Sequence, residues 1–526
     1  MINIAWILDS FETWTKQEFF ESFDIILSSN SQGIHHIMEN TGYSPILFPE
    51  ATNTDLYNDE VEPAEEYFCD YCFAGSSEKH EENITSVIYP EDLPYEFNIY
   101  GVGWGYSKLS EYYKGFVKHD LMPRVYASTK IVIDDTSEQG NIPSQVNNRV
   151  FDAIACGRLV VSNCKHGLKE LFGDKVPTFN SKESLEQLII EYLNNPDKRR
   201  AKVSELRSIV LSNHTYKQRA KELMDILRNF IVSDKVMIKI PAPSNWEKMG
   251  WGDYHFAVQL QKEFNKQGYI SKIQFYNDWD KYKDAVYDIV LVLRGLYEYK
   301  PKPIHYNIMW NLSHPDMVSF GEFNSYNQVY IASYYWADKI KSLVDVDVEG
   351  LLQCTNMSRF HREYDEKYDT ELLFVGNARF VYRKILHDLL PSKYHLDVYG
   401  HQWEGLLDDK YIVDEYIPNE ELYKAYSSTK VLLNDHWKDM REKGFISNRI
   451  FDGLACGAVI VTDHVKGLED VFSSDDIIIY DKKEELEDKI EEALHRNPVN
   501  PNVVSEHTFT NRVETIIEDY EKKFKK

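Results

Sequence analysis

The sequence predicts an α/β protein that is built from Rossmann-like domains with parallel sheets. Short apolar runs alternate with amphipathic helical stretches along the chain, which is typical of repeated βα units. Residues 288–293 and 458–461 are almost continuously apolar, as expected of strands that are covered on both faces. Residues 448–457 also repeat residues 148–157 almost unchanged, so the same domain type is predicted twice.

The repeat extends well beyond this motif. Matching segments pair residues 2–6 with 306–310, 71–75 with 373–376, 97–101 with 396–400, 126–135 with 426–435, and 214–216 with 507–509. The two copies therefore cover about residues 1–232 and 305–526. Residues 236–304 belong only to the second copy.

The segment that is unique to the second copy supplies a β-α-β start of its own. We expect strands near residues 237–240 and 272–276, with a helix around residues 255–267 between them. A complete second unit then holds two Rossmann-like domains, whereas the first unit lacks the opening strands of its leading domain. The chain is accordingly expected to be either a piece of a longer protein or a protein with a naturally reduced first unit.

The composition limits the partners and the compartment. The net charge of −26, from 85 acidic and 59 basic residues, argues against nucleic acid as a partner. No apolar run is long enough to span a membrane, and Asp9 and Glu12 stand where a signal peptide would carry basic residues. We therefore expect a cytoplasmic protein without a transmembrane segment, for which peripheral contact with a membrane stays open.

The cysteines predict no redox or metal site. Six cysteines are few for 526 residues, which fits a reducing compartment. Cys69 and Cys72 have a spacing that is found in redox and metal sites. However, no second pair of Cys or His residues has ligand spacing nearby, and the second copy has Thr370 and Leu373 there. A structural role is therefore favoured.

A candidate anion site lies at the start of the repeated motif in the second copy. Asn448 is expected to precede a helix that starts near Arg449, where backbone N–H groups and the helix dipole stabilise negative charge. Arg449 adds a cation, and His436 follows the preceding buried strand. Capping of the helix is the structural alternative for Asn448 and Asp452.

A second basic cluster follows another predicted strand. Gly376 ends this strand, and Arg379 and Arg383 follow four residues apart, as on one face of a helix. Paired arginines at such a turn can hold a diphosphate through forked hydrogen bonds, although a solvated helix face would look the same. The first copy has no arginine shortly after Gly75, which predicts weakened or lost diphosphate binding there.

Further residues are expected to face the same cleft from the leading domain. Trp251, Gly252 and His255 lie in a Gly-rich turn that opens a helix, where backbone can approach a ligand closely. Asp253 in this turn and His314 after a later strand are the candidate catalytic groups, with His314 as a general base. A helix-capping Asp and a surface His are the structural alternatives.

These motifs resemble the C-terminal domain of group 1 glycosyltransferases of the GT-B architecture, and most of all the subgroup related to spore-maturation glycosyltransferases. The shared pattern comprises a strand that ends in Gly376 and Asn377, the arginines, the 448–457 motif and a closing helix. The resemblance covers residues 365–526 well and residues 66–232 as an eroded second example.

The resemblance implies two facing Rossmann-like domains and transfer from a nucleoside-diphosphate sugar without a metal or other cofactor. It divides the chain into a partial Rossmann-like segment (1–65), a degenerate C-terminal-type domain (66–235), an acceptor domain (236–360) and a nucleotide-sugar domain (361–526).

The resemblance also implies roles for individual residues. Asp452 takes the place of the acid that binds the nucleotide ribose, while Arg379, Arg383 and Arg449 face the diphosphate. In one respect the chain departs from the family, because Gly444 stands where the wider family has another acid, eight residues before the ribose-binding one.

The preferred hypothesis is a glycosyltransferase of polysaccharide biosynthesis that acts on a glycan or protein-linked hydroxyl acceptor, with its activity in the second unit. The alternative from another class is a non-catalytic tandem protein that binds glycans or partners, which the missing arginines of the first copy favour. A phosphorylase or an epimerase on the same architecture is a third hypothesis.

Overall fold

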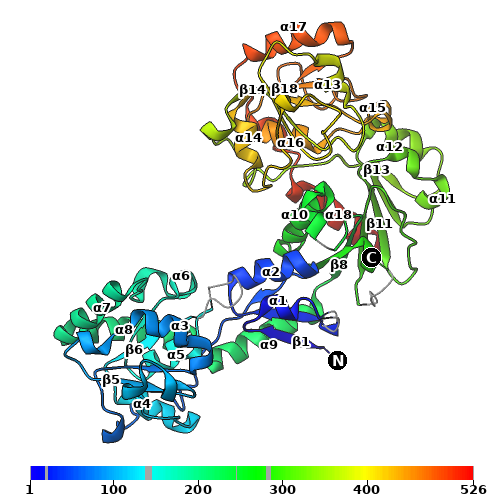
Figure 1. The fold of residues 1–526 in the computed structure, drawn as a ribbon. Helices are drawn as coiled ribbons and strands as arrows, with labels where there is room; N and C mark the ends of the chain where they lie inside the picture. Colours follow the sequence, from blue (N-terminus) through cyan, green and yellow to red (C-terminus); the bar gives the residue numbers. More distant parts are fainter. Residues whose placement is uncertain are drawn as a thin grey trace. The chain divides into compact units, whose positions relative to one another are not determined.

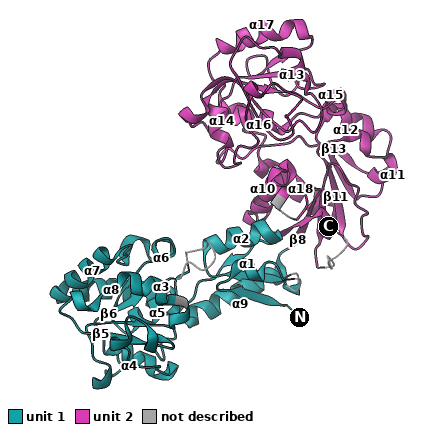
Figure 2. Ribbon diagram, in the orientation of Figure 1, with its two compact units in different colours: residues 1–233 teal, residues 234–526 magenta. Residues whose placement is uncertain are grey.

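The computed structural model describes residues 2–17, 20, 22–136, 145–244, 246–279 and 286–524. The chain divides into two compact units, residues 1–233 and 234–526 (Figure 2). Each unit contains two sheets, and helices connect the strands of each sheet (Figure 1). All the pairings between named strands are parallel. The predicted α/β class with Rossmann-like parallel sheets is therefore confirmed.

The first sheet of the second unit has its strands in the order β13-β12-β11-β10-β8-β9. These strands are β8 (Lys235–Ile240), β9 (Ile270–Phe275), β10 (Ile289–Arg294), β11 (Tyr306–Asn311), β12 (Gln328–Ile331) and β13 (Val348–Gly350). The connecting helices include α10 (Gly252–Lys266), α11 (Phe320–Phe323) and α12 (Tyr334–Lys341). The β-α-β start predicted for this unit is confirmed by β8, α10 and β9.

The second sheet of this unit has the order β16-β15-β14-β17-β18-β19. Its strands are β14 (Thr370–Val375), β15 (Leu396–Tyr399), β16 (Ile412–Asp414), β17 (Thr429–Asn434), β18 (Ile460–Asp463) and β19 (Ile478–Tyr480). Its helices are α13 (Lys384–Leu389), α14 (Leu422–Ser428), α15 (Lys438–Lys443), α16 (Asn448–Ala455) and α17 (Lys483–Leu494). The strand order reverses between the neighbours β14 and β17, and ligands of such sheets bind beyond the carboxyl ends of strands at this point.

The last helix, α18 (Phe509–Phe524), returns to the first sheet of the second unit. Phe509, Val513 and Ile516 belong to the apolar core that surrounds this sheet. The ring of Phe509 lies 4.7 Å from that of Phe256 in α10, between ring centres. The final helix therefore ties the two sheets of this unit together.

The first unit holds two smaller sheets, in the orders β1-β2-β3 and β5-β4-β6-β7. The strands are β1 (Ile4–Ile7), β2 (Ile25–Ser28), β3 (Ile46–Leu47), β4 (Tyr71–Ala74), β5 (Phe97–Tyr100), β6 (Ile131–Asp134) and β7 (Leu159–Ser162). The α-helices are α1 (Phe11–Trp14), α2 (Ser31–Thr41), α3 (Ser77–Val87), α4 (Met122–Ala127), α5 (Asn148–Ala155), α6 (Lys165–Phe172), α7 (Lys182–Asn194), α8 (Pro196–Asn213) and α9 (Tyr216–Val232). The order β5-β4-β6-β7 matches β15-β14-β17-β18 of the second unit.

Two local predictions in the second unit are wrong. Arg379 and Arg383 do not share a helical face, because Arg379 and Phe380 have left-handed φ angles of 53° and 59° and α13 begins only after Arg383. The helix of the repeated motif begins one residue earlier than expected, so that Ser447 and not Asn448 is its N-cap.

The cysteines lie in the interior of the protein. All six are buried free thiols, and the sulfur of Cys69 lies 3.3 Å from the hydroxyl oxygen of Thr129. Within the described ranges, no group of three or more His, Cys, Asp or Glu residues is placed to hold a metal ion. No helix in these ranges is long and apolar enough to cross a membrane.

Candidate functional site

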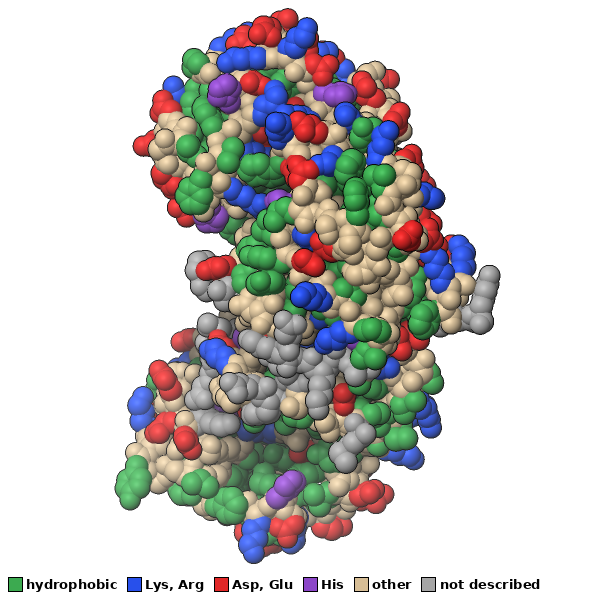
Figure 3. All heavy atoms as spheres, turned by 90° about the vertical axis from the view of Figure 1, so that its right-hand side faces the viewer, with side chains coloured by type: hydrophobic (Ala, Val, Ile, Leu, Met, Phe, Trp, Pro, Cys, Tyr) green, Lys and Arg blue, Asp and Glu red, His purple; other side chains and the backbone are tan. Residues whose placement is uncertain are grey.

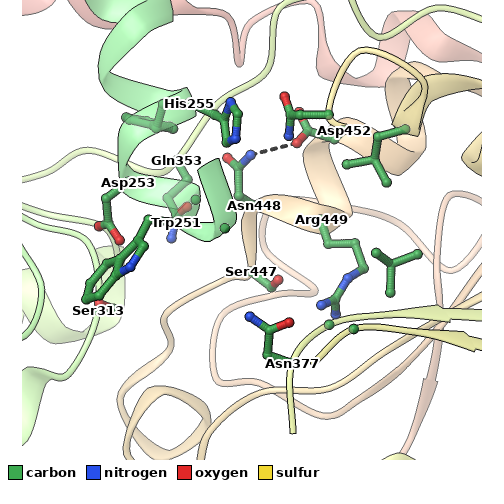
Figure 4. A pocket seen from close by; sticks show the side chains of 18 of the residues that line it. Trp251, Asp253, His255, Ser313, Gln353, Asn377, Ser447, Asn448, Arg449 and Asp452 are labelled. Atoms are coloured by element: carbon green, nitrogen blue, oxygen red, sulfur yellow. Dashed lines mark hydrogen bonds between the residues drawn. The ribbon is translucent and has the colours of Figure 1, made fainter. Parts of the chain in front are cut away.

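A cavity of about 420 Å³ opens in the second unit, where the ends of β14 and β17 face the start of α10. It is lined by all twelve residues that the sequence predicts for the site, namely Trp251, Gly252, Asp253, His255, His314, Gly376, Arg379, Arg383, His436, Asn448, Arg449 and Asp452. Figure 4 shows Trp251 and Asp253 on one wall and Arg449 and Asp452 on the other. Residues from separate turns of both sheets thus meet at the switch point.

Arg449 lies in the first turn of α16 with a neutral partner. Its Nη1 donates a hydrogen bond of 2.7 Å to the amide oxygen of Asn434, and its guanidinium lies over the ring of Phe374 at 5.1 Å. Gly376 lies so close that an added Cβ would come within 2.8 Å of Arg449 Nη2. Burial lowers the pKa of Arg449, but a guanidinium stays protonated. Its positive charge therefore remains available to an anion in the cavity.

Arg379 projects from the turn after β14, where its left-handed backbone places it outside any helix. No hydrogen bond or ion pair joins its guanidinium to another residue in the described part of the chain. Burial lowers the pKa of Arg379, and the carboxylate of Asp253 across the cavity opposes this shift. Arg379 is thus a second cation that faces the cavity.

Arg383 and His436 line the cavity but are held by other side chains. Arg383 forms a forked ion pair with Asp435 and lies 4.7 Å from the ring centre of Trp437. The Nδ1 of His436 lies 2.7 Å from Asp463, and its Nε2 accepts a 2.9 Å bond from the backbone N–H of Ser447. Both residues therefore fix the loops around the site, and His436 holds the segment that leads into α16.

Asp452 and Asn448 form a polar pair at the start of α16. The two oxygens of Asp452 accept bonds from the Thr355 hydroxyl at 2.7 Å and from the Asn448 amide at 2.8 Å (Figure 4). Burial raises the pKa of Asp452 to about 7, against the effect of the Thr355 bond. Asn448 Oδ1 is buried and has no partner among the described residues. A donor on a bound ligand would satisfy this oxygen.

The opposite wall carries the two candidate catalytic groups. Asp253 lies in the first turn of α10, and burial raises its pKa against the opposing charge of Arg379. His314 follows β11 with a left-handed φ of 53°, and its Nδ1 lies 2.8 Å from the hydroxyl of Ser313. Burial lowers the pKa of His314. Near neutral pH, His314 is therefore an uncharged imidazole.

The remaining predicted residues frame the entrance. Gly252 begins α10, and an added Cβ there would meet nothing within 4 Å, so the backbone is open to the cavity. Trp251 is the N-cap of this helix. The Nε2 of His255 lies 2.8 Å from the carbonyl oxygen of Met249, which fixes the turn.

Arg359 is a further cation of the cavity that no sequence pattern marks, and Gly444 differs from the family for a structural reason. Arg359 lines the cavity and donates to Asn419, and burial lowers its pKa against the effect of Asp452. It lies outside every strand and motif, so no sequence signal marked it. Gly444 has a φ of 77°, and a Cβ there would lie 2.5 Å from the carbonyl oxygen of Lys466. An acid at this position would strain the backbone and clash.

The matching place in the first unit has different charges. Arg149 Nη1 forms an ion pair of 2.7 Å with the buried carboxylate of Asp134, where the second unit has Asn434. His80 lies 2.8 Å from Asp135 and replaces the Arg383–Asp435 pair. The nearest arginine to the β4 end is thus already neutralised.

The family model described as Glycosyl transferase-like matches residues 82–225 and 379–518, which together make up more than half of the chain. The chain belongs to this glycosyl transferase-like family. Each matched segment contains one copy of the repeated motif, at residues 148–157 and 448–457. The glycosyltransferase resemblance inferred from the motifs is thereby confirmed.

Solved structures with related features include several glycosyltransferases. Sucrose-phosphate synthase from Thermosynechococcus elongatus is 11% identical with a TM-score of 0.41, over 55% of this chain and 99% of that one. A glycosyltransferase of avilamycin A biosynthesis is 13% identical with a TM-score of 0.39, over 55% and 97%. A T4 phage enzyme in complex with UDP-glucose is 14% identical with a TM-score of 0.36, over 55% and 96%. A comparison with curated proteins finds no match.

Proposed function

We propose that the second unit of this glycosyl transferase-like protein moves a sugar from a nucleoside diphosphate to a hydroxyl group of a glycan or protein-linked acceptor. The observation that carries this proposal is the convergence of Arg379, Arg449 and the N-terminus of α16 on one cavity. Two cations and a helix N-terminus favour a bound diphosphate. Polysaccharide biosynthesis in the cytoplasm is the setting we propose, with peripheral membrane contact left open.

The donor is proposed to lie along the wall formed by β14 and α16. Its diphosphate would contact Arg379 and Arg449, and its ribose would meet Asp452 and the unpaired oxygen of Asn448. Negative charge builds up on the diphosphate as the bond to the sugar breaks. Fixed cations stabilise that charge in a water-poor cavity, which is the task that a metal performs in other transferases. We therefore propose transfer without a metal or a further cofactor.

Of the two candidate catalytic groups, we propose Asp253 rather than His314 as the general base, because Asp253 interacts with Arg379 across the cavity and so lies near the proposed diphosphate. In a single displacement, the acceptor hydroxyl gives its proton to the Asp253 carboxylate while its oxygen bonds to the anomeric carbon. The bond from that carbon to the diphosphate breaks, and the nucleoside diphosphate leaves. The positive charge of Arg379 lowers the pKa of Asp253. A diphosphate bound to Arg379 offsets that charge, so the pKa of Asp253 rises and its carboxylate becomes a stronger base. His314 is proposed to orient the acceptor from the same wall.

The first unit is proposed to be non-catalytic and to bind a glycan or a partner. Asp134 neutralises Arg149, and Ser10, with a φ of 54°, takes the place of His314. The matching motifs and strand orders support an origin by duplication within the subgroup related to spore-maturation glycosyltransferases, with the domains as divided in the sequence analysis.

A mass-spectrometric screen of nucleotide sugars against glycan acceptors tests the proposed activity. We expect release of the nucleoside diphosphate with a matching gain of one sugar on the acceptor, and slow hydrolysis of the donor when no acceptor is present. Cleavage that requires inorganic phosphate would indicate a phosphorylase instead. If no nucleotide sugar is consumed under any condition, the proposal is wrong.

A further inference from the structure

A second, wider cavity in the second unit adjoins the donor cavity, and we call it the mouth. Its volume is about 1300 Å³, whereas sites for single small molecules measure roughly 300–1000 Å³. The two cavities share lining residues, including Trp251, His314, Arg379 and Trp437. A molecule in the mouth therefore lies beside the proposed donor site and has room for several sugar rings.

Acidic side chains outnumber basic ones in the mouth. The acids of its lining are Glu247, Asp316, Glu404, Glu415, Asp439 and Glu442. The lining includes two cations, Arg379 and Lys438, and Lys443 adds a third through its ion pair with Asp316. Lys438 lies 4.0 Å from Glu442, and His401 of the lining lies 3.4 Å from Glu415. Since Arg379 is assigned to the donor diphosphate, the surface left to an acceptor still carries more acidic than basic side chains. On the face drawn in Figure 3, acidic and basic side chains are interspersed, and the chain as a whole carries a net charge of −26.

Aromatic and amide side chains complete the lining. Trp251, Tyr416 and Trp437 offer ring surfaces, and Asn377 and Gln402 offer uncharged hydrogen-bonding groups. Ring faces pack against the C–H groups of sugars, while amides and carboxylates bond to hydroxyl groups. Tyr416 and Met249, which also lines the mouth, are 39% and 36% exposed as whole residues, so apolar surface of the mouth is open to a ligand.

From this combination we infer that the mouth selects an uncharged oligosaccharide as the acceptor and repels anionic polymers. The inference rests on the proposed function and specifies the acceptor of the same site. Like charges that are brought together at an interface cost affinity, and such repulsion is an effective source of specificity. The aromatic rings supply the attraction, and the carboxylates bind hydroxyl groups while excluding uronic acids, phosphodiesters and nucleic acids.

The inference is tested by comparing two oligomers of equal length, a neutral glucose hexamer and a galacturonate hexamer. Binding of each to the full chain is measured by calorimetry in the presence of saturating uridine diphosphate, at low and at high salt. We expect the neutral hexamer to bind at least about tenfold more tightly at low salt, and the difference to shrink as salt screens the carboxylates. Equal or tighter binding of the galacturonate hexamer, or binding of neither, would overturn the inference.

Two charge-reversal variants test whether the repulsion of an anionic ligand comes from the mouth or from the surface as a whole. Glu404 and Glu442 line the mouth but not the donor cavity, so the double variant E404K/E442K should gain about tenfold in affinity for the galacturonate hexamer. The control E484K/E487K makes the same charge change on the exposed face of α17 and should gain nothing. Equal gains in both variants would overturn the inference.

A measurement of nucleotide binding distinguishes failure of this inference from failure of the proposed function. Both double variants should bind nucleoside diphosphates as the unaltered chain does. If the unaltered chain binds no nucleoside diphosphate, the proposed function falls and this inference falls with it. If it binds a nucleoside diphosphate but prefers the galacturonate hexamer, the inference alone is wrong.

Discussion

Arg149 and Arg449 occupy matching positions in the two units, but their partners carry different charges. Arg149 pairs with the carboxylate of Asp134 at 2.7 Å, whereas Arg449 donates to the amide of Asn434 at 2.7 Å. Both partners end the corresponding strands, β6 and β17, and both are fully buried. The two units therefore share the geometry of this contact, while only the second leaves a positive charge for a ligand.

The contacts that repeat in both units are structural. Thr52 donates to Asp152 at 2.6 Å, and Thr355 donates to Asp452 at 2.7 Å. Likewise, Arg219 and Arg512 each bond to backbone carbonyls of the segment that precedes the second sheet of their unit. The differences collect around the cavity, where Glu50 in the first unit replaces Gln353 in the second. The shared motif therefore indicates that the two units have the same fold. Whether a unit can bind a diphosphate depends instead on the charges of the residues around that motif.

The largest effect is expected from D253N, which removes the proposed base of the second unit and leaves the first unit unchanged. General-base catalysis contributes roughly 10²–10⁴ in rate, so kcat should fall by about that factor. The dissociation constant of the nucleoside diphosphate should stay within about threefold, because an amide of the same shape remains. H314N serves as the comparison and should cost about tenfold. An unchanged kcat in D253N would assign the base elsewhere.

The next largest effect is expected from N434D, which gives Arg449 the carboxylate partner that Arg149 has. A carboxylate both neutralises the guanidinium and repels the diphosphate, so nucleotide affinity should fall by about 30- to 100-fold, measured by equilibrium dialysis. The reciprocal variant D134N in the first unit is the matched control and should leave affinity unchanged. If N434D, with an unchanged melting temperature, binds nucleotide normally, Arg449 does not contact the diphosphate.

A smaller effect is expected from pH. Because Asp452 has a pKa raised to about 7, it becomes a charged carboxylate, and so a stronger hydrogen-bond acceptor for ribose hydroxyls, as pH rises through that value. Nucleotide affinity should therefore rise about threefold to tenfold between pH 6 and pH 8. The D452N variant should show a flat profile, whereas D152N in the first unit should keep the rise. A rise that persists in D452N would point to another group.

The raised pKa of Asp452 also predicts that the free energy of unfolding falls as pH rises, which is opposite to the trend in nucleotide affinity. Its folded pKa of about 7 lies above the ordinary pKa of 3.8 for an aspartate, so folding favours the protonated form. The stabilising contribution is fully present below the lower value and is lost as pH rises towards the upper one. Asp152, whose pKa burial also raises to about 7, should behave in the same way. Unfolding by urea at several pH values should show this loss reduced in D452N and in D152N.

The smallest effect is expected from R383K. The guanidinium of Arg383 is already paired with Asp435, as His80 is paired with Asp135 in the first unit. Its loss should therefore lower nucleotide affinity by no more than about threefold, while the melting temperature falls because a lysine cannot form the forked pair. An affinity loss as large as that of N434D would show that Arg383 binds the diphosphate directly.

Much of this comparison could be predicted from the sequence. The apolar runs indicated the parallel strands, and the repeated motif located α5 and α16, because both signals are local. Strand ends that meet at a switch point also brought Arg379, Arg449 and Asp452 to one cavity, as expected. Local patterns did not indicate which side chain pairs with each arginine. Whether an arginine meets Asn434 or Asp134 depends on residues 15 positions away that only the folded sheet brings together.

The backbone of the site was also beyond local patterns. The spacing of Arg379 and Arg383 fitted a helix, but left-handed residues delay the helix until Lys384. Similarly, the contacts of His436 with Asp463 and with the backbone N–H of Ser447 form only because the fold brings these residues together. Arg359 carried no signal because it lies in an irregular segment.

The most direct test of the central claim is the stoichiometry of nucleotide binding to the full chain. Calorimetric titration with uridine, thymidine and guanosine diphosphates should give one site per chain for at least one of them. That site should be lost in R449A and kept in R149A, with both variants folded. Two sites per chain, or a single site that is lost in R149A and kept in R449A, would contradict the account.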